Sequence, residues 1–338
     1  MPKASFIKTI IAGNLADEYI IDTRGKNSNH VCGGSLLYTA AGAKSFIDEI
    51  GLLSRVDATY PAQWLSKLET KGFDTRGIIQ SVRPFEQRRF YSWRNAEHCD
   101  NDNPVTYYAK NGLPFPHELL GYHQENIAAD DAVWGNIKIS VRNGLPREFL
   151  DVTSAHLCPL DFSTQVKLIN LLEGGTINTL TIAPSNQYMK SEYVDELRVI
   201  LKGAVAFFPT ETQMISLCHT RARENWEMME LISEMGCQLV VVMRGLRGFW
   251  MFDSKANKRY TLPLYPSSAI DPTGMNEAFA GAFHGDYKNS YDPVHALLSG
   301  CVYASLALEG TGPFYCSEAL PGLAEARFEK MKKLLTIQ

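Results

Sequence analysis

The chain has 338 residues, of which 45% are hydrophobic and 21% are charged, and its formal net charge is −4. This composition is ordinary for a soluble globular protein, and the length suffices for one large α/β domain. The acidic balance gives no support for a nucleic-acid or membrane-surface partner. No apolar run reaches the length of about 18 residues that a membrane-spanning helix needs.

Seven cysteines are scattered along the chain and form no Cys-x-x-Cys pair. An odd and dispersed set of this kind is typical of reduced thiols. The first eight residues, MPKASFIK, lack the apolar core of a signal peptide. These features together lead us to expect a cytoplasmic protein.

The N-terminal part begins with a strand pattern and a pair of glycines. Residues 6–12 predict a buried strand that ends at Gly13-Asn14, and Asp17 precedes a second strand-like piece. Gly33 and Gly34 then lead into a helical pattern from residue 35. Adjacent glycines before a helix allow the backbone to approach a ligand closely, although a tight turn would use them equally well.

Residues 52–57 predict a second core strand, and residues 61–71 predict a helix with proline at its start. Residues 78–93 are strand-like, with arginines interleaved among aromatic residues. Pro84 within this stretch indicates either an edge strand or a break between two strands. A basic and aromatic stretch could contact nucleic acid, but we favour a solvated strand because the chain as a whole is acidic.

The segment 94–135 has no clean periodicity. Its aromatic and histidine side chains could line a substrate pocket or pack an irregular surface segment, and we favour packing. These side chains are Tyr107, Tyr108, Phe115, His117, Tyr122 and His123. If the substrate is unusual, this segment is where we expect the difference, because functional variation concentrates in loops.

Strand and helix patterns alternate through the rest of the chain. Strands are predicted near 149–156, 179–183, 204–208 and 239–243, and helices over 163–172, 192–201, from 209, over 293–308 and over 319–335. This alternation predicts a doubly wound α/β fold with a mostly parallel sheet flanked by helices. Ligands in such sheets bind beyond the carboxyl ends of the strands.

The stretch 269–283 combines turn chemistry with a helical pattern. Asp271 and Thr273 are residue types that cap helix N-termini, and Gly274 gives the turn freedom of φ. A helix N-terminus attracts anions such as phosphate, and a carboxylate at Glu277 could accept a proton from an attacking hydroxyl. The plainer alternative is a capped helix whose Glu277 only interacts with the helix dipole.

This stretch resembles the C-terminal signature of the PfkB (ribokinase-like) family of carbohydrate and nucleoside kinases. The matching residues are Asp271, Pro272, Thr273, Gly274, Phe279, Gly281 and Ala282. Met275, Asn276 and Glu277 stand where the family has Ala, Gly and its catalytic Asp. The resemblance implies that Glu277 is the catalytic base and that Thr273, Gly274, Met275 and Asn276 form the anion hole for a phosphate. It also implies ATP and Mg²⁺ as cofactors.

The N-terminal region is similar to the family's substrate-binding signature. The resemblance implies that Asp17, Gly33 and Gly34 bind substrate hydroxyls, while Tyr38 stands where the family often has Asn. Residues 72–78 resemble the link into the family's small β-lid, which we expect over about 14–32 and 77–112. Relatives often pair such lids across a dimer, so a homodimer through the lid is an expectation as well.

Two further turns resemble family motifs. Pro209, Thr210 and Gln213 match a Pro-Asn-x-x-Glu motif whose Glu organises Mg²⁺ through water. Gln213 and the nearby Glu211 are therefore candidates for an indirect metal role, and we expect no direct protein ligand. Arg244, Gly245 and Gly248 resemble the turn beside the nucleotide, where Arg244 could face phosphates or simply lie at the surface.

The resemblance extends from residue 6 to about residue 312, and residues 1–338 are expected to form one ribokinase-like domain. It implies an ATP-dependent kinase that phosphorylates a hydroxyl of a sugar, a nucleoside or a related small molecule. A pseudokinase or repurposed protein, binding a small molecule or a partner without phosphoryl transfer, is the alternative. The replacements at Gln213, Asn276 and Glu277 keep that alternative open, because all three concern the phosphoryl-transfer centre.

Overall fold

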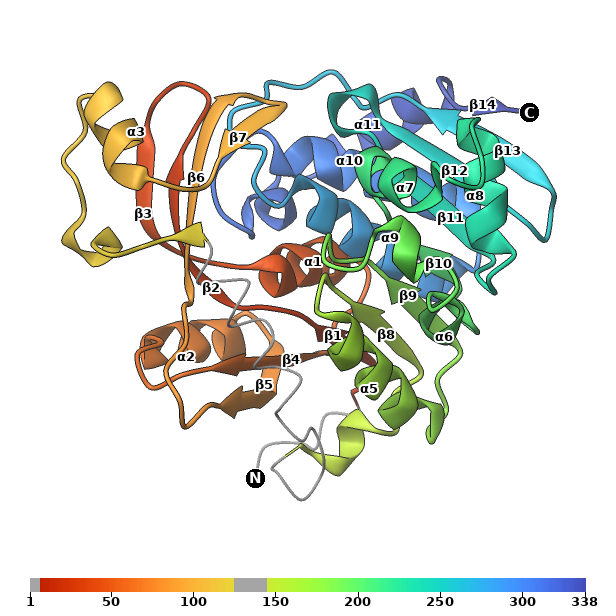
Figure 1. The fold of residues 1–338 in the computed structure, drawn as a ribbon, viewed down its shortest axis with the longest axis horizontal. Coiled ribbons are helices and arrows are strands. Elements are labelled where there is room, and N and C mark those ends of the chain that lie inside the picture. Colours follow the sequence, from red (N-terminus) through yellow and green to blue (C-terminus); the bar gives the residue numbers. More distant parts are fainter. Residues whose placement is uncertain (1–6, 125–144) are drawn as a thin grey trace.

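The computed structural model describes residues 7–124 and 145–338, which form two sheets and their flanking helices (Figure 1). A ten-stranded sheet forms the body of the molecule. Its strands, in spatial order, are β14 (Thr336–Ile337), β13 (Lys258–Leu262), β12 (Phe249–Asp253), β11 (Leu239–Met243), β10 (Ala206–Phe207), β9 (Thr179–Ile182), β8 (Ser154–Leu157), β1 (Thr9–Ala12), β4 (Ile50–Val56) and β5 (Phe73–Gln80).

From β11 to β5 every neighbouring pair of strands is parallel, whereas β12, β13 and β14 add antiparallel strands at one edge. Consecutive residues of β11 are buried on opposite faces: Val240 and Val242 join one core cluster, and Val241 and Met243 join another. Strands covered on both faces are typically apolar throughout. The prediction of a mostly parallel sheet flanked by helices is confirmed.

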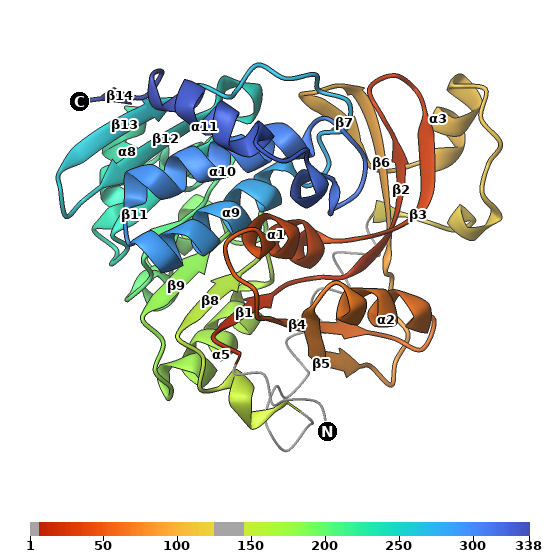
Figure 2. The ribbon, with the colours of Figure 1, turned by 180° about the vertical axis from the view of Figure 1, so that it is seen from behind.

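Helices cover both faces of this sheet (Figures 1 and 2). One face carries α1 (Ser35–Lys44), α2 (Ala62–Thr70), α9 (Met275–Ser290), α10 (Pro293–Ala307) and α11 (Leu323–Lys332). The other face carries α5 (Phe162–Glu173), α6 (Arg198–Leu201), α7 (Glu211–Cys218) and α8 (Asn225–Ser233). Helix α8 and the β12–β13 hairpin lie in stretches for which the sequence analysis made no prediction.

Helices α1 and α9 lie side by side in direct backbone contact (Figure 2). A Cβ atom added to Gly42 would lie 2.3 Å from the carbonyl oxygen of Ala278, and one added to Gly281 would lie 1.9 Å from that of Thr39. Glycine is therefore needed at both positions, because any side chain would push the helices apart. This contact brings the N-termini of α1 and α9 to the same region of the molecule.

The four-stranded sheet forms a lid on one side of the body (Figure 1). Its strands, in spatial order, are β3 (Asn27–Gly33), β2 (Ala16–Ile21), β6 (Arg88–Asn95) and β7 (His98–Asp100). One face of the lid is covered by α3 (Pro104–Lys110) and the residues that follow it. The buried cluster there consists of Tyr19, Ile21, Phe90, Tyr108, Leu119 and Tyr122, with Tyr107 and Phe115 packed against it.

Of the six side chains of 94–135 for which we favoured packing, the four aromatic ones pack here, whereas His117 and His123 are exposed; residues 125–135 lie outside the part of the chain that the structure describes. The expected start of the second lid segment at residue 77 is wrong. Residues up to Gln80 belong to β5, which pairs with β4 in the large sheet, and the lid resumes at Arg88. Pro84 lies in the break between these two strands, as the sequence indicated.

All seven cysteines are free thiols. Among the described residues, no helix combines the length and the apolar character needed to cross a bilayer.

Candidate active site

A cavity of about 610 Å³ opens between the lid and the body of the molecule. The lid contributes Ala16, Arg89 and Tyr91, the N-terminus of α1 contributes Ser35 and Thr39, and the first turns of α9 contribute Asn276, Glu277 and Ala280. The loop after β9 and the start of α7 complete the wall with residues 183–187, Thr210, Thr212 and Gln213. Its volume is in the range of ordinary small-molecule sites.

The N-terminus of α9 lies at this cavity, where Asn276 and Glu277 line the wall. Gly274 precedes the helix with φ of 76°, a conformation that glycine adopts without strain. The N–H of Thr273 donates to Oδ1 of Asp271 at 3.0 Å, and the N–H of Met275 donates to the carbonyl of Pro272 at 3.2 Å. The N–H groups of Gly274 and Asn276 have no acceptor among the described residues, so they are available to an anion.

Glu277 and Asn276 are the two signature residues that line the cavity. Burial raises the pKa of the Glu277 carboxyl, and its own backbone N–H partly offsets this effect. A carboxylate with a raised pKa is a better proton acceptor than an exposed one. The side-chain oxygen of Asn276 is buried without a partner among the described residues, which suits a ligand that brings a donor.

Glu18 is a buried carboxyl group next to this site. Its oxygens accept hydrogen bonds from the N–H of Gly34 and from the hydroxyl of Tyr38, both at 2.8 Å. Burial raises the pKa of Glu18 to about 8, with smaller increases from Asp271 and Glu277 and decreases from the two hydrogen bonds. A Cβ atom at Gly33 would lie 2.1 Å from Oε2 of Glu18, so glycine is needed there for Glu18 to fit.

The lid is hydrogen-bonded to the turn before α9. Nε1 of Trp93 donates to Oγ1 of Thr273 at 2.9 Å, and Oγ1 of Thr23 donates to the carbonyl of Ala269 at 2.8 Å. Both bonds come from the lid, so the lid helps to hold the turn that leads into α9.

The chain resembles known kinases in sequence and in fold. It is 25% identical over 282 residues to a cytidine kinase of Thermococcus kodakarensis, covering 82% of this chain and 88% of that protein. It superposes on the Methanocaldococcus jannaschii nucleoside kinase, described as an archaeal member of the ribokinase family, with a TM-score of 0.69 and 17% identity, covering 96% of this chain and 99% of that one. This chain has the ribokinase-like fold.

A putative ribokinase II from E. coli, in complex with ATP and Mg²⁺, superposes with a TM-score of 0.67 and 17% identity, over 96% of this chain and 99% of that one. No family model matches the sequence. The resemblance to the PfkB (ribokinase-like) kinases, first drawn from the motifs, is confirmed by these relatives.

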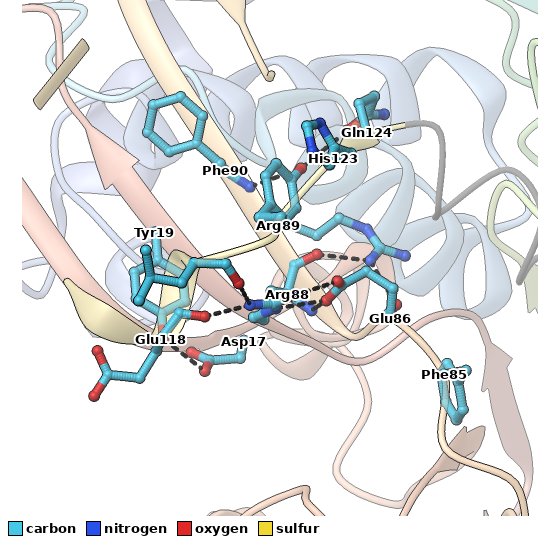
Figure 3. A network of polar contacts seen from close by, with 12 residues as sticks. Asp17, Tyr19, Phe85, Glu86, Arg88, Arg89, Phe90, Glu118, His123 and Gln124 are labelled. Carbon is cyan, nitrogen blue, oxygen red and sulfur yellow. Dashed lines mark hydrogen bonds and ion pairs between the residues drawn. The ribbon is translucent and has the colours of Figure 1, made fainter. Parts of the chain in front are cut away.

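Within this ribokinase-like fold, Asp17 does not reach the cavity. Its carboxylate is hydrogen-bonded to Nδ1 of His30 at 3.1 Å and to the hydroxyl of Tyr19 at 3.2 Å. Asp17 belongs to the residues around Arg88 (Figure 3), whereas its neighbour Ala16 lines the cavity. Successive residues of a strand point to opposite faces, so a shift of one residue decides which carboxylate faces the body. Gly34 lines the cavity, whereas Gly33 contacts Glu18 behind it.

The other residues of the predicted anion hole, Thr273, Gly274 and Met275, do not line the cavity. Thr273 accepts the hydrogen bond from Trp93, Gly274 lies under the ring of Tyr38, and Met275 is buried in the core. The prediction that Asp271 or Thr273 caps α9 is wrong, because Gly274 occupies the cap position and no side chain bonds there. Asp271 instead orders the turn through the N–H of Thr273.

Gln213 lines the cavity, and its side chain forms three hydrogen bonds to protein groups. Its side-chain oxygen accepts the N–H of Thr210 at 2.8 Å, and its amide nitrogen donates to the carbonyl of Pro184 at 3.2 Å and to Asn186 at 2.8 Å. Glu211 forms ion pairs with Arg244 and Arg247 outside the cavity wall. Both side chains are therefore already engaged by protein groups.

The turn of Arg244, Gly245 and Gly248 does not line the cavity. The guanidinium of Arg244 lies over the ring of Trp250, 3.8 Å from its centroid. Gly248 has φ of 87°, and a Cβ atom there would lie 2.2 Å from the carbonyl of Leu262, so this glycine shapes the β11–β12 turn. Arg89 lines the cavity, and Glu18 and Trp93 bond residues next to it, although no sequence motif pointed to these three residues; the only signal was the arginine-rich stretch that contains Arg89.

Proposed function

We propose that this protein is an ATP-dependent kinase that transfers a phosphoryl group to a hydroxyl of a small polar molecule, either a nucleoside or a sugar. The observation that carries the proposal is the placement of Glu277 at the cavity wall, in the first turn of α9, beside unpaired N–H groups. That combination of a base and an anion site is what phosphoryl transfer to an alcohol requires.

Each group of this site has a role in the proposed reaction. Glu277 accepts the proton of the acceptor hydroxyl as its oxygen forms a bond to the terminal phosphorus of ATP. The bond between that phosphorus and the oxygen of ADP breaks, and the N–H groups of Gly274 and Asn276 hold the charge on the transferred group. The lid excludes water from the cavity, which favours the alcohol over water as the acceptor.

The residues present fit a nucleotide phosphate better than they fit a protein-bound metal ion. The α9 N-terminus suits phosphate oxygens. Mg²⁺ prefers oxygen ligands, and the phosphates of ATP and water would supply most of them, because Gln213 and Glu211 are engaged elsewhere. When bound, Mg²⁺ would neutralise phosphate charge.

A nucleoside is the acceptor class that we favour. The curated relative is a cytidine kinase, and one structural relative is a nucleoside kinase. The described cavity wall carries the amide side chains of Asn14, Gln124, Asn186, Gln187 and Asn276, besides that of Gln213, which is engaged by protein groups. Amides offer donors and acceptors together, as nucleobase edges do.

The test compares wild-type protein with Glu277→Gln, using radiolabelled ATP and a panel of nucleosides and sugars. We expect turnover by the wild type and a loss of about 10²–10⁴-fold in the variant, with ATP affinity retained. Glu192→Gln, the same change at an exposed position, is the control. Unchanged turnover in the Glu277 variant would refute its role. Nucleotide binding without turnover on any acceptor would favour the pseudokinase alternative.

A further inference from the structure

Arg89 is a cation that projects from the lid into the cavity. Among the described residues of the wall, it is the only one with a positive charge, and Glu277 is the only one with a negative charge. His156 also lines the wall, but burial and the nearby His284 hold its pKa well below the ordinary value, so it is neutral. Arg89 therefore sets the charge of its end of the cavity.

The guanidinium of Arg89 is held in place without being neutralised. Nη1 donates to the backbone carbonyls of Glu86 at 3.0 Å and of Arg88 at 2.9 Å. No carboxylate among the described residues forms an ion pair with it. Figure 3 shows the contrast with Arg88, which lies at the centre of the network and pairs with Glu86 at 2.6 Å.

The strand places Arg89 away from the phosphate-binding turn. Arg89, Tyr91 and Trp93 share the cavity-facing side of β6, and Trp93 bonds Thr273 at the turn before α9. Arg89 lies four residues before Trp93, roughly 13 Å along the strand. Tyr91 lines the cavity together with Arg89 and Glu277. The pKa of Tyr91 is raised mainly by burial, is raised further by Glu18 and Glu277, and is lowered by Arg89.

We propose that Arg89 binds an anionic group of the acceptor substrate, a carboxylate or a phosphate ester, at the end of the molecule opposite the hydroxyl that receives the phosphoryl group. A charged group half-buried in a cavity is costly unless a counter-charge joins it, and the planar guanidinium suits both kinds of anion. This substrate class narrows the proposed kinase function and rests on it. It also predicts that a neutral nucleoside or sugar is a poorer acceptor than its acidic counterpart.

Binding is measured by calorimetry on the full chain carrying Glu277→Gln, without ATP, so that turnover plays no part. The probes are matched pairs: cytidine and cytidine 3′-monophosphate, glucose and gluconate, ribose and ribonate, fructose and fructose 6-phosphate. We expect at least one acid to bind about 10-fold or more tightly than its neutral partner, with a preference that weakens as salt rises. Preference for the aldonates identifies a carboxylate, and preference for a phosphorylated probe identifies a phosphate ester.

Arg89→Gln should abolish this preference, and Arg89→Lys should retain part of it, because lysine keeps the charge but lacks the planar fork. Arg83→Gln, at an exposed arginine before β6, should leave the preference intact. Thermal unfolding checks that each variant folds. The proposal is overturned if no acid is preferred, or if Arg89→Gln weakens acidic and neutral probes equally. If only neutral acceptors are turned over, the proposal for Arg89 is overturned and the kinase function stands. If acids bind but no acceptor is turned over, the kinase function is overturned and the anion-binding role of Arg89 stands.

Discussion

Tyr38 lies directly against Gly274: a Cβ atom built on Gly274 would fall 1.9 Å from Cδ1 of the Tyr38 ring. The same tyrosine donates its hydroxyl to Glu18 of the lid. One side chain of α1 therefore contacts both the lid and the residue that begins α9. At this position the resemblance predicts an amide, whereas Tyr38 supports the turn before α9.

Gly274→Ala should be strongly destabilising. The new methyl group would carry the strain of φ near 76° and would also collide with Tyr38. The matched control is Gly203→Ala, where φ is 81° but nothing lies within 4 Å. We expect the control to lose about 1–2 kcal/mol of unfolding free energy from strain alone, and Gly274→Ala to lose about 1–3 kcal/mol more from overpacking. The check is urea denaturation of both variants. Equal losses of unfolding free energy would show that the ring of Tyr38 moves aside without destabilising the protein.

Glu18→Gln should remove a pH dependence of stability. The pKa of Glu18 is raised from 4.5 to about 8 in the folded protein, so the folded state holds its proton more tightly than the unfolded state. Its contribution is fully present below pH 4.5 and is lost as the pH rises through about 8. We expect the wild type to lose stability over this range relative to Glu18→Gln, measured by urea denaturation at several pH values. Parallel pH profiles for the two proteins would contradict the prediction.

Gln213→Glu should not restore a metal site, although it introduces the residue that the family carries. The amide nitrogen of Gln213 donates to Pro184 and Asn186, and a carboxylate cannot donate these bonds. We expect a loss of about 1–3 kcal/mol in unfolding free energy. We also expect no gain in Mg²⁺-dependent ATP affinity by calorimetry. Tighter Mg²⁺-dependent binding in this variant would show that the loop can rearrange around a metal.

The sequence alone was sufficient to predict the large, mostly parallel sheet and the helix that begins after Gly274. Runs such as Leu239–Met243 can only be buried on both faces, and the pattern after Gly274 is helical. The sequence could not predict which side chains of a lid strand face the body, because a shift of one residue in the strand register exchanges the two faces. Asp17 and Glu18 are adjacent carboxylates on a strand, and only the pairing of β2 with β3 and β6 determines which one faces the body.

The other roles that the sequence did not predict depend on contacts between segments that are distant in the chain. Nothing local in the sequence indicates that Trp93 reaches Thr273, or that Gln213 ties down the loop after β9. Arg88 and Arg89 are indistinguishable as residue types, yet one is neutralised by Glu86 and the other faces the cavity. Propensity and periodicity describe segments one at a time, whereas these roles depend on which segments meet.

The glycine contact between α1 and α9 also constrains how the molecule is made. Its two partners come from the first and the last fifth of the chain, so this contact has very high sequence separation. During synthesis α1 emerges early, and its glycine face has no partner until α9 has left the ribosome. Non-local contacts of this kind slow folding and leave apolar surface exposed in the meantime. The other apolar side chains of α1 can pack early on β1, β4 and α2, so only the face around Gly42 has to wait until almost all of the protein has been translated.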